Sequence, residues 1–215
     1  NLMDQLMKQA WGLFTEVESK GGFLKCFKEG FIQSSIATTR EAKLKKISQR
    51  RDIIVGSNQY PNIQESLDPA EVQPSAGVAE ASGIALLRPQ RAAEEFEKLR
   101  LDTEEYVKKH GQESKPKVLL LEYGENVVMR KARATFSYRF FGTSGFDVIE
   151  GKPVVSLNDA MSEIQAKSPQ VVVLCSSDDD YKETGEAFAH RFKTEFGDSK
   201  LILAGYPADI VEQLK

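Results

Sequence analysis

The sequence predicts an α/β fold built on a parallel sheet, and two observations carry that prediction. After Pro116, short apolar runs alternate with stretches whose apolar residues recur at helical spacing. The apolar runs are nearly continuous, which is typical of parallel strands covered on both faces. In such folds ligands bind at the carboxyl ends of the strands, so function is sought in the loops that follow them.

The composition excludes several classes of protein. The chain has 215 residues, 40% hydrophobic and 28% charged, an ordinary balance for a chain that buries a sizeable core. A net charge of −3 argues against a nucleic-acid partner. The basic run at 43–51 is interpreted as a solvated helix end. No apolar run reaches the length of a membrane span, so we expect no membrane partner either.

Cysteine usage is typical of a reducing compartment. Cys26 and Cys175 lie far apart and lack a CxxC spacing, which excludes a disulfide framework and most zinc sites. We therefore expect a cytoplasmic protein. Because the chain begins at Asn1 inside a helical pattern, without an initiating Met, we also expect a fragment of a longer protein.

The first sixty residues predict helices followed by one short strand. Apolar residues at helical spacing predict a helix over 2–19, which the glycines after Lys20 end. A short turn around Phe23 follows, and then a helix from about 31 to 47. The apolar run at 53–56 predicts a short buried strand, whose neighbouring strands are not found in this chain.

The middle of the chain predicts an extended linker and a charged helix. From Pro61 to Gly83, prolines and small polar residues occur without apolar periodicity, which is typical of a linker. Pro89 stands where a helix can begin, and apolar residues at helical spacing continue it to about His110.

The last hundred residues predict alternating strands and helices in a flavodoxin-like order joined by right-handed crossovers. The predicted strands are Val118–Glu122, Phe146–Ile149, Val171–Cys175 and Leu201–Ala204. Apolar residues at helical spacing predict three helices between them: Val128, Ala132, Phe136 and Phe140; Leu157, Met161 and Ile164; and Tyr181, Phe188 and Phe192. Because Lys215 falls inside a predicted helix, we expect a fifth strand beyond it.

Polar residues follow the first and third strands, and each set has a structural interpretation beside a functional one. Glu122, Tyr123 and Glu125 follow the first strand, where a lone Glu is more often solvated than catalytic. Three adjacent carboxylates at 178–180 are the kind of group that holds Mg²⁺. Neighbouring side chains cannot all converge on one ion, however, and Ser and Asp favour helix N-termini. We therefore interpret 176–180 as a helix cap.

The remaining candidates are weaker. Cys175 ends an apolar strand without a nearby His, so we interpret it as a buried structural thiol rather than a nucleophile. Gly205, in the turn after the fourth strand, is a weak phosphate signal. His110 and His190 lie on helices away from the strand ends and receive no role. The loop after the first strand contains no His, no Cys and, beyond Gly124, no glycine.

Three stretches and the strand order together resemble the methylmalonyl-CoA mutase family. Residues 10–14 (AWGLF) and 54–58 (IVGSN) are similar to the last helices and strand of that family's substrate barrel, a TIM-type barrel. Residues 91–100 (RAAEEFEKLR) are similar to the linker helix of its small subunits. The strands that follow match its cobalamin-binding domain in order and in the placement of the loops.

The resemblance implies three parts. Residues 1–60 would be the C-terminal piece of the substrate-barrel domain, and 61–90 an extended linker. Residues 91–215 would be a cobalamin-binding-like domain of flavodoxin type, with its C-terminus truncated.

One departure from the family concerns the cofactor. Cobalamin-binding members carry Asp-x-His-x-x-Gly after the first strand, and the His coordinates cobalt. Here 125–131 (ENVVMRK) supplies none of the three, and the glycine pair after the fourth strand is reduced to Gly205 followed by Tyr206. We expect Tyr206 and 125–131 to occupy space that the nucleotide tail of the cofactor needs.

This pattern resembles the small, or beta, non-catalytic subunit of heterodimeric methylmalonyl-CoA mutase. The resemblance implies a structural, stabilising role beside a large catalytic subunit in propionate metabolism. That partner would hold adenosylcobalamin and isomerise methylmalonyl-CoA and succinyl-CoA, whereas this chain would lack an active site, with no catalytic, cofactor-binding or metal-binding residue. Two alternatives stay open: a receiver-like signalling domain with an acidic Mg²⁺-binding loop, and a cobalamin-binding module without the usual His ligand.

Overall fold

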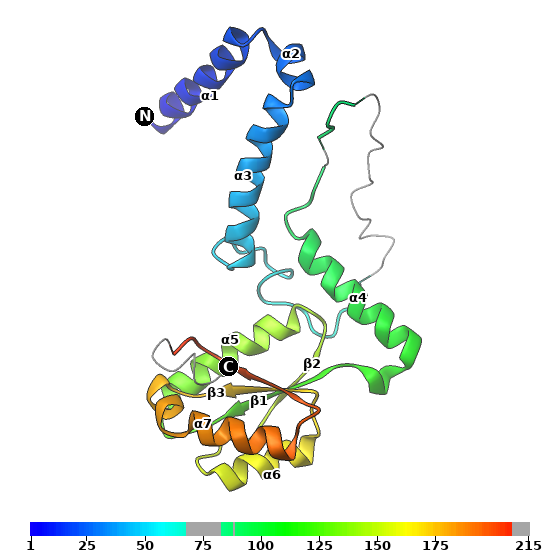
Figure 1. The fold of residues 1–215 in the computed structure, drawn as a ribbon, viewed down its shortest axis with the longest axis vertical. Helices are drawn as coiled ribbons and strands as arrows, with labels where there is room; N and C mark the ends of the chain where they lie inside the picture. The colour runs from blue at the N-terminus through cyan, green and yellow to red at the C-terminus, as the bar shows by residue number, and fades with distance from the viewer. Residues whose placement is uncertain (68–82, 88, 208–215) are drawn as a thin grey trace. The chain divides into compact units, whose positions relative to one another are not determined.

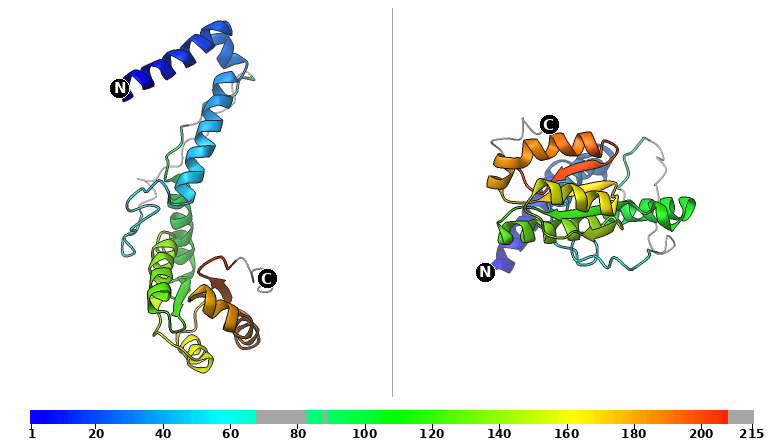
Figure 2. Two further views of the ribbon diagram at one scale, coloured as in Figure 1. Left: turned by 90° about the vertical axis from the view of Figure 1, so that its left-hand side faces the viewer. Right: turned by 90° about the horizontal axis from the view of Figure 1, so that it is seen from below.

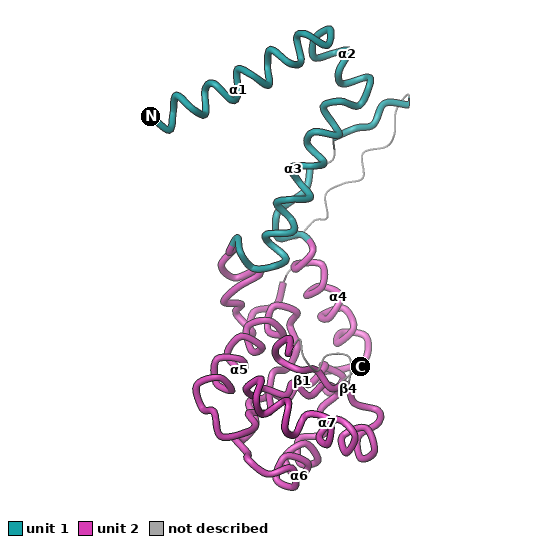
Figure 3. The backbone as a smooth tube through the Cα atoms, turned by 60° about the vertical axis from the view of Figure 1, so that its left-hand side comes forward, with its two compact units in different colours: residues 1–52, 73–94 teal, residues 53–72, 95–215 magenta. Residues whose placement is uncertain are grey.

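The chain forms two compact units in a computed structural model that describes residues 1–67, 83–87 and 89–207 (Figure 1). Unit 1 comprises residues 1–52 and 73–94, and unit 2 comprises 53–72 and 95–215 (Figure 3). Unit 2 contains the sheet and is the larger of the two.

The described residues of unit 1 form three helices before residue 52. They are α1 (Leu2–Ser19), α2 (Phe23–Lys28) and α3 (Phe31–Ser48). The predicted helices over 2–19 and 31–47 are confirmed to within one residue, and the predicted turn at Phe23 is a short helix. Gly21 and Gly22 follow α1 with φ of 102° and 85°, a conformation that glycine adopts without strain. Helix α1 has no buried residue, although its apolar side chains lie at helical spacing.

The predicted buried strand at 53–56 is wrong. Val55 forms only an isolated bridge with Gln59, across a turn in which Gly56 has a φ of 87°. Ile53 and Val55 are 55% and 74% exposed. An apolar run becomes a strand only where a neighbouring strand pairs with its backbone, and within the described ranges no neighbour pairs with this run beyond that bridge.

Unit 2 is built on a four-stranded parallel sheet. Its strands are β1 (Lys117–Glu122), β2 (Asp147–Glu150), β3 (Val171–Cys175) and β4 (Lys200–Leu203), in the order β2-β1-β3-β4. Every strand pair is parallel, which confirms the predicted α/β class and fits a flavodoxin-like domain. Strands β1 and β3 lie at the centre and are buried over nearly their whole length.

Helices cover both faces of this sheet (Figures 1 and 2). They are α5 (Val127–Gly142), α6 (Leu157–Lys167) and α7 (Asp178–Glu195), preceded in the chain by α4 (Glu94–His110) and the 3₁₀ turn η1 (Gln112–Ser114). Alternate residues of the central strands point to opposite faces. Leu119 and Leu174 pack with α6 and α7, while Leu120 and Val173 pack with α5. Helix α4 begins five residues after Pro89, later than predicted.

Helix α5 turns an unexpected face toward the sheet. The apolar stripe that predicts this helix is largely exposed, with Val128 at 77% and Phe136 at 57%. The fully buried residues of α5 are small, Ala134, Ser137 and Gly142, and Phe141 packs partly buried against the same core. Small side chains let a helix lie close to a sheet. The face of α5 that carries Ala134 and Ser137 therefore packs on the sheet, although the adjacent face of the helix is more apolar.

The beginning of the predicted linker is held against α4. Arg100 donates hydrogen bonds to the carbonyl oxygens of Asn62, at 2.8 Å, and of Glu65. Glu104 accepts from the backbone N–H of Leu67 at 3.0 Å and from the Ser66 hydroxyl at 2.9 Å. Residues 61–67 therefore belong to the packed part of unit 2. The rest of the predicted linker lies largely outside the described residues, as does the helix predicted after Pro207. No helix in the described part of the chain is long and apolar enough to cross a membrane.

Candidate functional site

The carboxyl ends of β1, β3 and β4 lie at one edge of the sheet, as parallel strands require, and we call it the carboxyl edge. Helices α5 and α7 begin after β1 and β3, each with a capped N-terminus, as α6 does after β2. Asn126 caps α5 by accepting a hydrogen bond from the backbone N–H of Met129 at 3.1 Å. Ser177 caps α7 in the same way, accepting from the N–H of Asp180 at 3.1 Å. The loops of the carboxyl edge are thereby fixed at their helical ends.

The acidic run after β3 is confirmed as a helix cap. The Asp180 carboxylate accepts a hydrogen bond from the Ser177 backbone N–H at 3.2 Å, which completes a capping box. Ser176 Oγ lies 2.7 Å from the same carboxylate. Burial works against ionisation of Asp180, but the hydrogen bonds from Ser177 and Ser176 and the nearby Arg130 lower its pKa below the ordinary value.

Two arginines, one helical turn apart on α5, also reach the carboxyl edge. Arg130 donates to the carbonyl oxygen of Gly124, and its Nε lies 3.6 Å from Glu122 Oε2. Arg133 donates to the carbonyl oxygen of Ser176, and its Nη2 lies 2.6 Å from Asp178 Oδ1. Burial is the largest single influence and lowers the pKa of Arg133, but the interactions with Asp178 and Tyr181 together outweigh it and raise the pKa overall.

Tyr181 lies beneath Arg133 and connects β3 to β4. The guanidinium centre of Arg133 is 5.1 Å from the centroid of the tyrosine ring. The Tyr181 hydroxyl accepts from the Ser176 N–H at 3.0 Å and donates to the Leu174 carbonyl at 2.7 Å, with the Ala204 carbonyl 3.2 Å away. Burial raises the pKa of Tyr181 to about 12, so the hydroxyl stays protonated at neutral pH.

Two glycines of the carboxyl edge lie against these side chains. A Cβ at Gly205 would lie 3.0 Å from the Arg133 guanidinium carbon, and Gly205 has a φ of 148°. A Cβ at Gly124 would lie 2.6 Å from a carboxylate oxygen of Asp180, and Gly124 has a φ of 91°. In phosphate-binding loops glycine lets the backbone approach a ligand. Here the backbone approaches side chains of the same chain.

The other candidate residues lie apart from this network. Cys175 is fully buried, and burial raises its pKa to about 12, which supports the structural interpretation of its thiol. Glu125 is exposed, and Tyr206 is 76% exposed. His110 stacks on Tyr106 at the end of α4 with ring centroids 4.3 Å apart.

Sequence reasoning missed Arg130 and Arg133. The signal was present, because arginines three residues apart on a helix share one face. Both stand near the start of the helix that follows the first strand, and that end of the helix meets the carboxyl edge.

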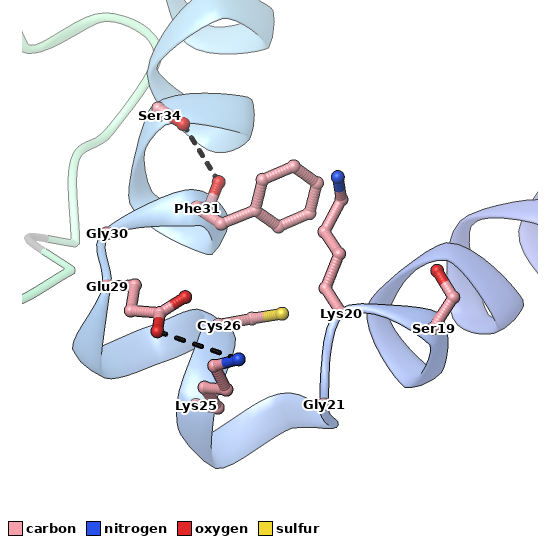
Figure 4. A pocket seen from close by; sticks show the side chains of 9 residues that line it. All are labelled: Ser19, Lys20, Gly21, Lys25, Cys26, Glu29, Gly30, Phe31 and Ser34. Atoms are coloured by element: carbon pink, nitrogen blue, oxygen red, sulfur yellow. Dashed lines mark hydrogen bonds and ion pairs between the residues drawn. The ribbon is translucent and has the colours of Figure 1, made fainter.

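Two other features bear on ligand binding, the clustering of metal-ligating side chains and a hollow in unit 1. Among the residues that the structure describes, no three His, Cys, Asp or Glu side chains gather as a metal site. A hollow of about 830 Å³ in unit 1 is lined by residues of α1, α2 and α3 (Figure 4). Its cationic groups are already engaged: Lys25 lies 3.9 Å from Glu29, and Lys20 lies over the Phe31 ring.

Comparison with known proteins gives consistent matches. The model of the family described as methylmalonyl-CoA mutase matches residues 1–127. The methylmalonyl-CoA mutase small subunit of Porphyromonas gingivalis is 33% identical over 210 residues, covering 96% of this chain and 32% of the relative. The small subunit from Streptomyces virginiae is 31% identical over 204 residues, covering 95% and 32%. A methylmalonyl-CoA mutase of Cereibacter sphaeroides is 33% identical over 93 residues, 43% of this chain and 13% of that protein. The chain thus spans about a third of the length of these small subunits.

Proposed function

The chain belongs to the methylmalonyl-CoA mutase family, and from that membership we propose that it is part of the non-catalytic small subunit of a heterodimeric mutase. In this proposal a large partner subunit binds adenosylcobalamin and isomerises methylmalonyl-CoA and succinyl-CoA. The present chain stabilises that partner and has a degenerate cobalamin site of its own. The relatives named small subunit, which align over almost the whole chain, support this choice within the family.

The observation that carries the proposal is the chemistry of the carboxyl edge. An imidazole is the ligand that the family places under cobalt, and residues 125–131 contain none. Two guanidinium groups, those of Arg130 and Arg133, reach this edge, where they pair with Glu122 and Asp178. A cation that cannot be deprotonated is not a metal ligand. These residues do not fit a cobalt-bound corrin, so we derive no chemical step through that cofactor on this chain.

The finer division of the chain is also a proposal. We assign residues 1–60 to the end of a TIM-type substrate barrel, 61–90 to a linker, and 91–215 to a cobalamin-binding-like domain. The exposed apolar stripe of α1, which includes Leu6 and Phe14, supports the first assignment, because a barrel helix buries such a stripe against its neighbours. Two free cysteines, Cys26 and Cys175, support a cytoplasmic location.

The cofactor part of the proposal is tested by an absorbance titration of the chain with adenosylcobalamin. We expect the spectrum to stay that of the free cofactor at every protein concentration. A cobalamin-binding mutase serves as the positive control. A saturable shift toward the base-off spectrum with the present chain would show that it still takes the cofactor, and would contradict the degenerate site.

The partner part is tested by mixing the chain with a large mutase subunit and measuring the complex by analytical ultracentrifugation. We expect a one-to-one complex and a higher melting temperature for the large subunit, because binding to the folded state stabilises it. Sedimentation as two separate species at all concentrations would contradict the stabilising role.

A further inference from the structure

Three of the loops at the carboxyl edge contact side chains of α5. They are the loop after β1, around Gly124; the loop after β3, around Ser176; and the loop after β4, around Gly205. In ligand-binding sheets of this class, a bound phosphate or cofactor fills the space between such loops. In this chain the two arginines of α5 contact all three loops.

Arg133 connects the second and third loops. It donates to the carbonyl oxygen of Ser176, pairs with Asp178 at 2.6 Å, and lies over the ring of Tyr181. Its guanidinium also lies against the Cα of Gly205, so closely that a Cβ there would come within 3.0 Å to 3.2 Å of guanidinium atoms. One planar cation therefore contacts both loops and the tyrosine that joins their strands.

Arg130 acts in the same way on the first loop. It donates to the carbonyl oxygen of Gly124, and its Nε faces Glu122 at the end of β1. Both side chains are mostly buried, at 14% and 10% exposure. Its charge also lowers the pKa of Asp180, which lies against Gly124 and caps α7. The Ser176 hydroxyl also donates to the Tyr123 carbonyl at 2.6 Å, so the first loop is joined to the second directly as well as beside Arg130.

We propose that Arg130 and Arg133 form an internal latch, which holds the three loops of the carboxyl edge together in the place where a ligand holds them in binding members of this fold. The glycines support the latch independently. Gly124 and Gly205 both have positive φ, and both leave room for a charged side chain of this chain. The purpose of the latch rests on the proposed loss of the cobalamin site, whereas its geometry does not depend on that proposal.

The test is hydrogen exchange of backbone amides in the full chain, compared between wild type and Arg133→Ala. We expect exchange in residues 176–180 and 204–206 to become at least about tenfold faster in the variant. The first of these loops loses the charge-assisted hydrogen bonds that Arg133 donates to Ser176 and Asp178, and the second loses the guanidinium packed against Gly205. Arg191→Ala is the matched control. Arg191 also lies on a helix of unit 2, where it pairs with Glu195 at 2.6 Å and donates to Asn158 Oδ1 at 2.6 Å, and neither partner belongs to the three loops. We expect no change in the three loops there.

A second arm restores the missing group. Guanidinium chloride at millimolar concentration should slow exchange in the loops of Arg133→Ala, whereas ammonium chloride at equal ionic strength should not, because only guanidinium reproduces the planar fork. Arg133→Lys covers the case in which the alanine variant does not fold, and the same loops should loosen in it.

Several results would overturn the latch. They are loop exchange in Arg133→Ala that equals wild type, faster exchange spread evenly over the whole sheet, and loosened loops that guanidinium does not restore. The exchange result stands apart from the cofactor titration. If wild type binds adenosylcobalamin, the proposed function fails, and the loops of Arg133→Ala still decide whether the latch exists.

Discussion

The two units of this chain differ in how far they bury their large apolar side chains. In unit 2, large apolar residues such as Phe188 are fully buried, and the charged groups of the carboxyl edge have partners within the same unit. In unit 1, α1 exposes Trp11 and Phe14 and buries nothing. Unit 2 therefore encloses a core of large apolar residues, although its helix α5 also exposes Val128 and Phe136. Unit 1 carries an apolar helix face of the kind that proteins cover with another surface.

The largest effect is expected from truncating a buried aromatic residue in unit 2. Phe188 is fully buried in the core and packs edge-on against Tyr123 at 5.8 Å between ring centroids. Phe188→Ala should lower the free energy of unfolding of the sheet by about 3–5 kcal/mol. Phe14→Ala, at a site that is 52% exposed, should change it by less than about 0.5 kcal/mol. Urea unfolding followed by circular dichroism measures both, and equal losses would remove the contrast between the units.

A smaller effect is expected from adding one methyl group at a glycine. Gly124→Ala should lower the free energy of unfolding by about 1–3 kcal/mol, because Gly124 has positive φ and the new Cβ would clash with the Asp180 carboxylate. Gly12→Ala is the counterpart in unit 1, where nothing lies within 4 Å, and it should stabilise α1 by about 0.5–1 kcal/mol. Thermal unfolding of both variants checks the opposite signs, and a neutral Gly124→Ala would mean that Asp180 moves aside freely.

Removing a helix cap is expected to cost less again. Ser177→Ala removes the hydroxyl that accepts from the Asp180 N–H in the capping box of α7. This loss should lower the free energy of unfolding by about 1 kcal/mol. Ser19→Ala is the control, because its hydroxyl only donates to a carbonyl within exposed α1. Chemical denaturation should separate the two, and a Ser177→Ala protein as stable as Ser19→Ala would contradict the cap.

The smallest effect concerns pH. The pKa of Asp180 is lower in the folded protein than its ordinary value, so its ionised form favours the folded state. This contribution should be fully present above the unfolded pKa of about 3.9, and it should fade as the pH falls through the lower folded value. The stability difference between wild type and Asp180→Asn should therefore shrink on acidification. A difference that does not change with pH would contradict the shift.

Much of unit 2 was predictable because its signals are local. The central strands are apolar over almost every residue, so their bounds were predicted to within one residue. The cap at Ser177 follows from the side chains that favour a helix start. These features depend on short stretches of sequence, and the structure adds little to them.

The errors came from features that depend on distant partners. The run at 53–56 has strand-forming residues, but a strand also needs a neighbour to pair with. In α5, periodicity identified the stripe through Val128 and Phe136, but it could not tell that the narrower face of Ala134 and Ser137 packs on the sheet. Arg130 and Arg133 were overlooked although their spacing places them on one face of the helix, because the spacing does not tell which groups the ends of these long side chains reach.

The contact between Arg100 and residues 61–67 bears on how the α/β unit should be produced by itself. A protein cut at residue 91, where the sequence suggests that the domain begins, would keep Arg100 but lose the carbonyl groups of Asn62 and Glu65 that its guanidinium binds. Glu104 would lose the backbone amide of Leu67 at the same time. A recombinant protein for spectroscopy or crystallisation of the sheet should therefore begin before Ile53, so that it keeps residues 61–67, which Arg100 and Glu104 bind.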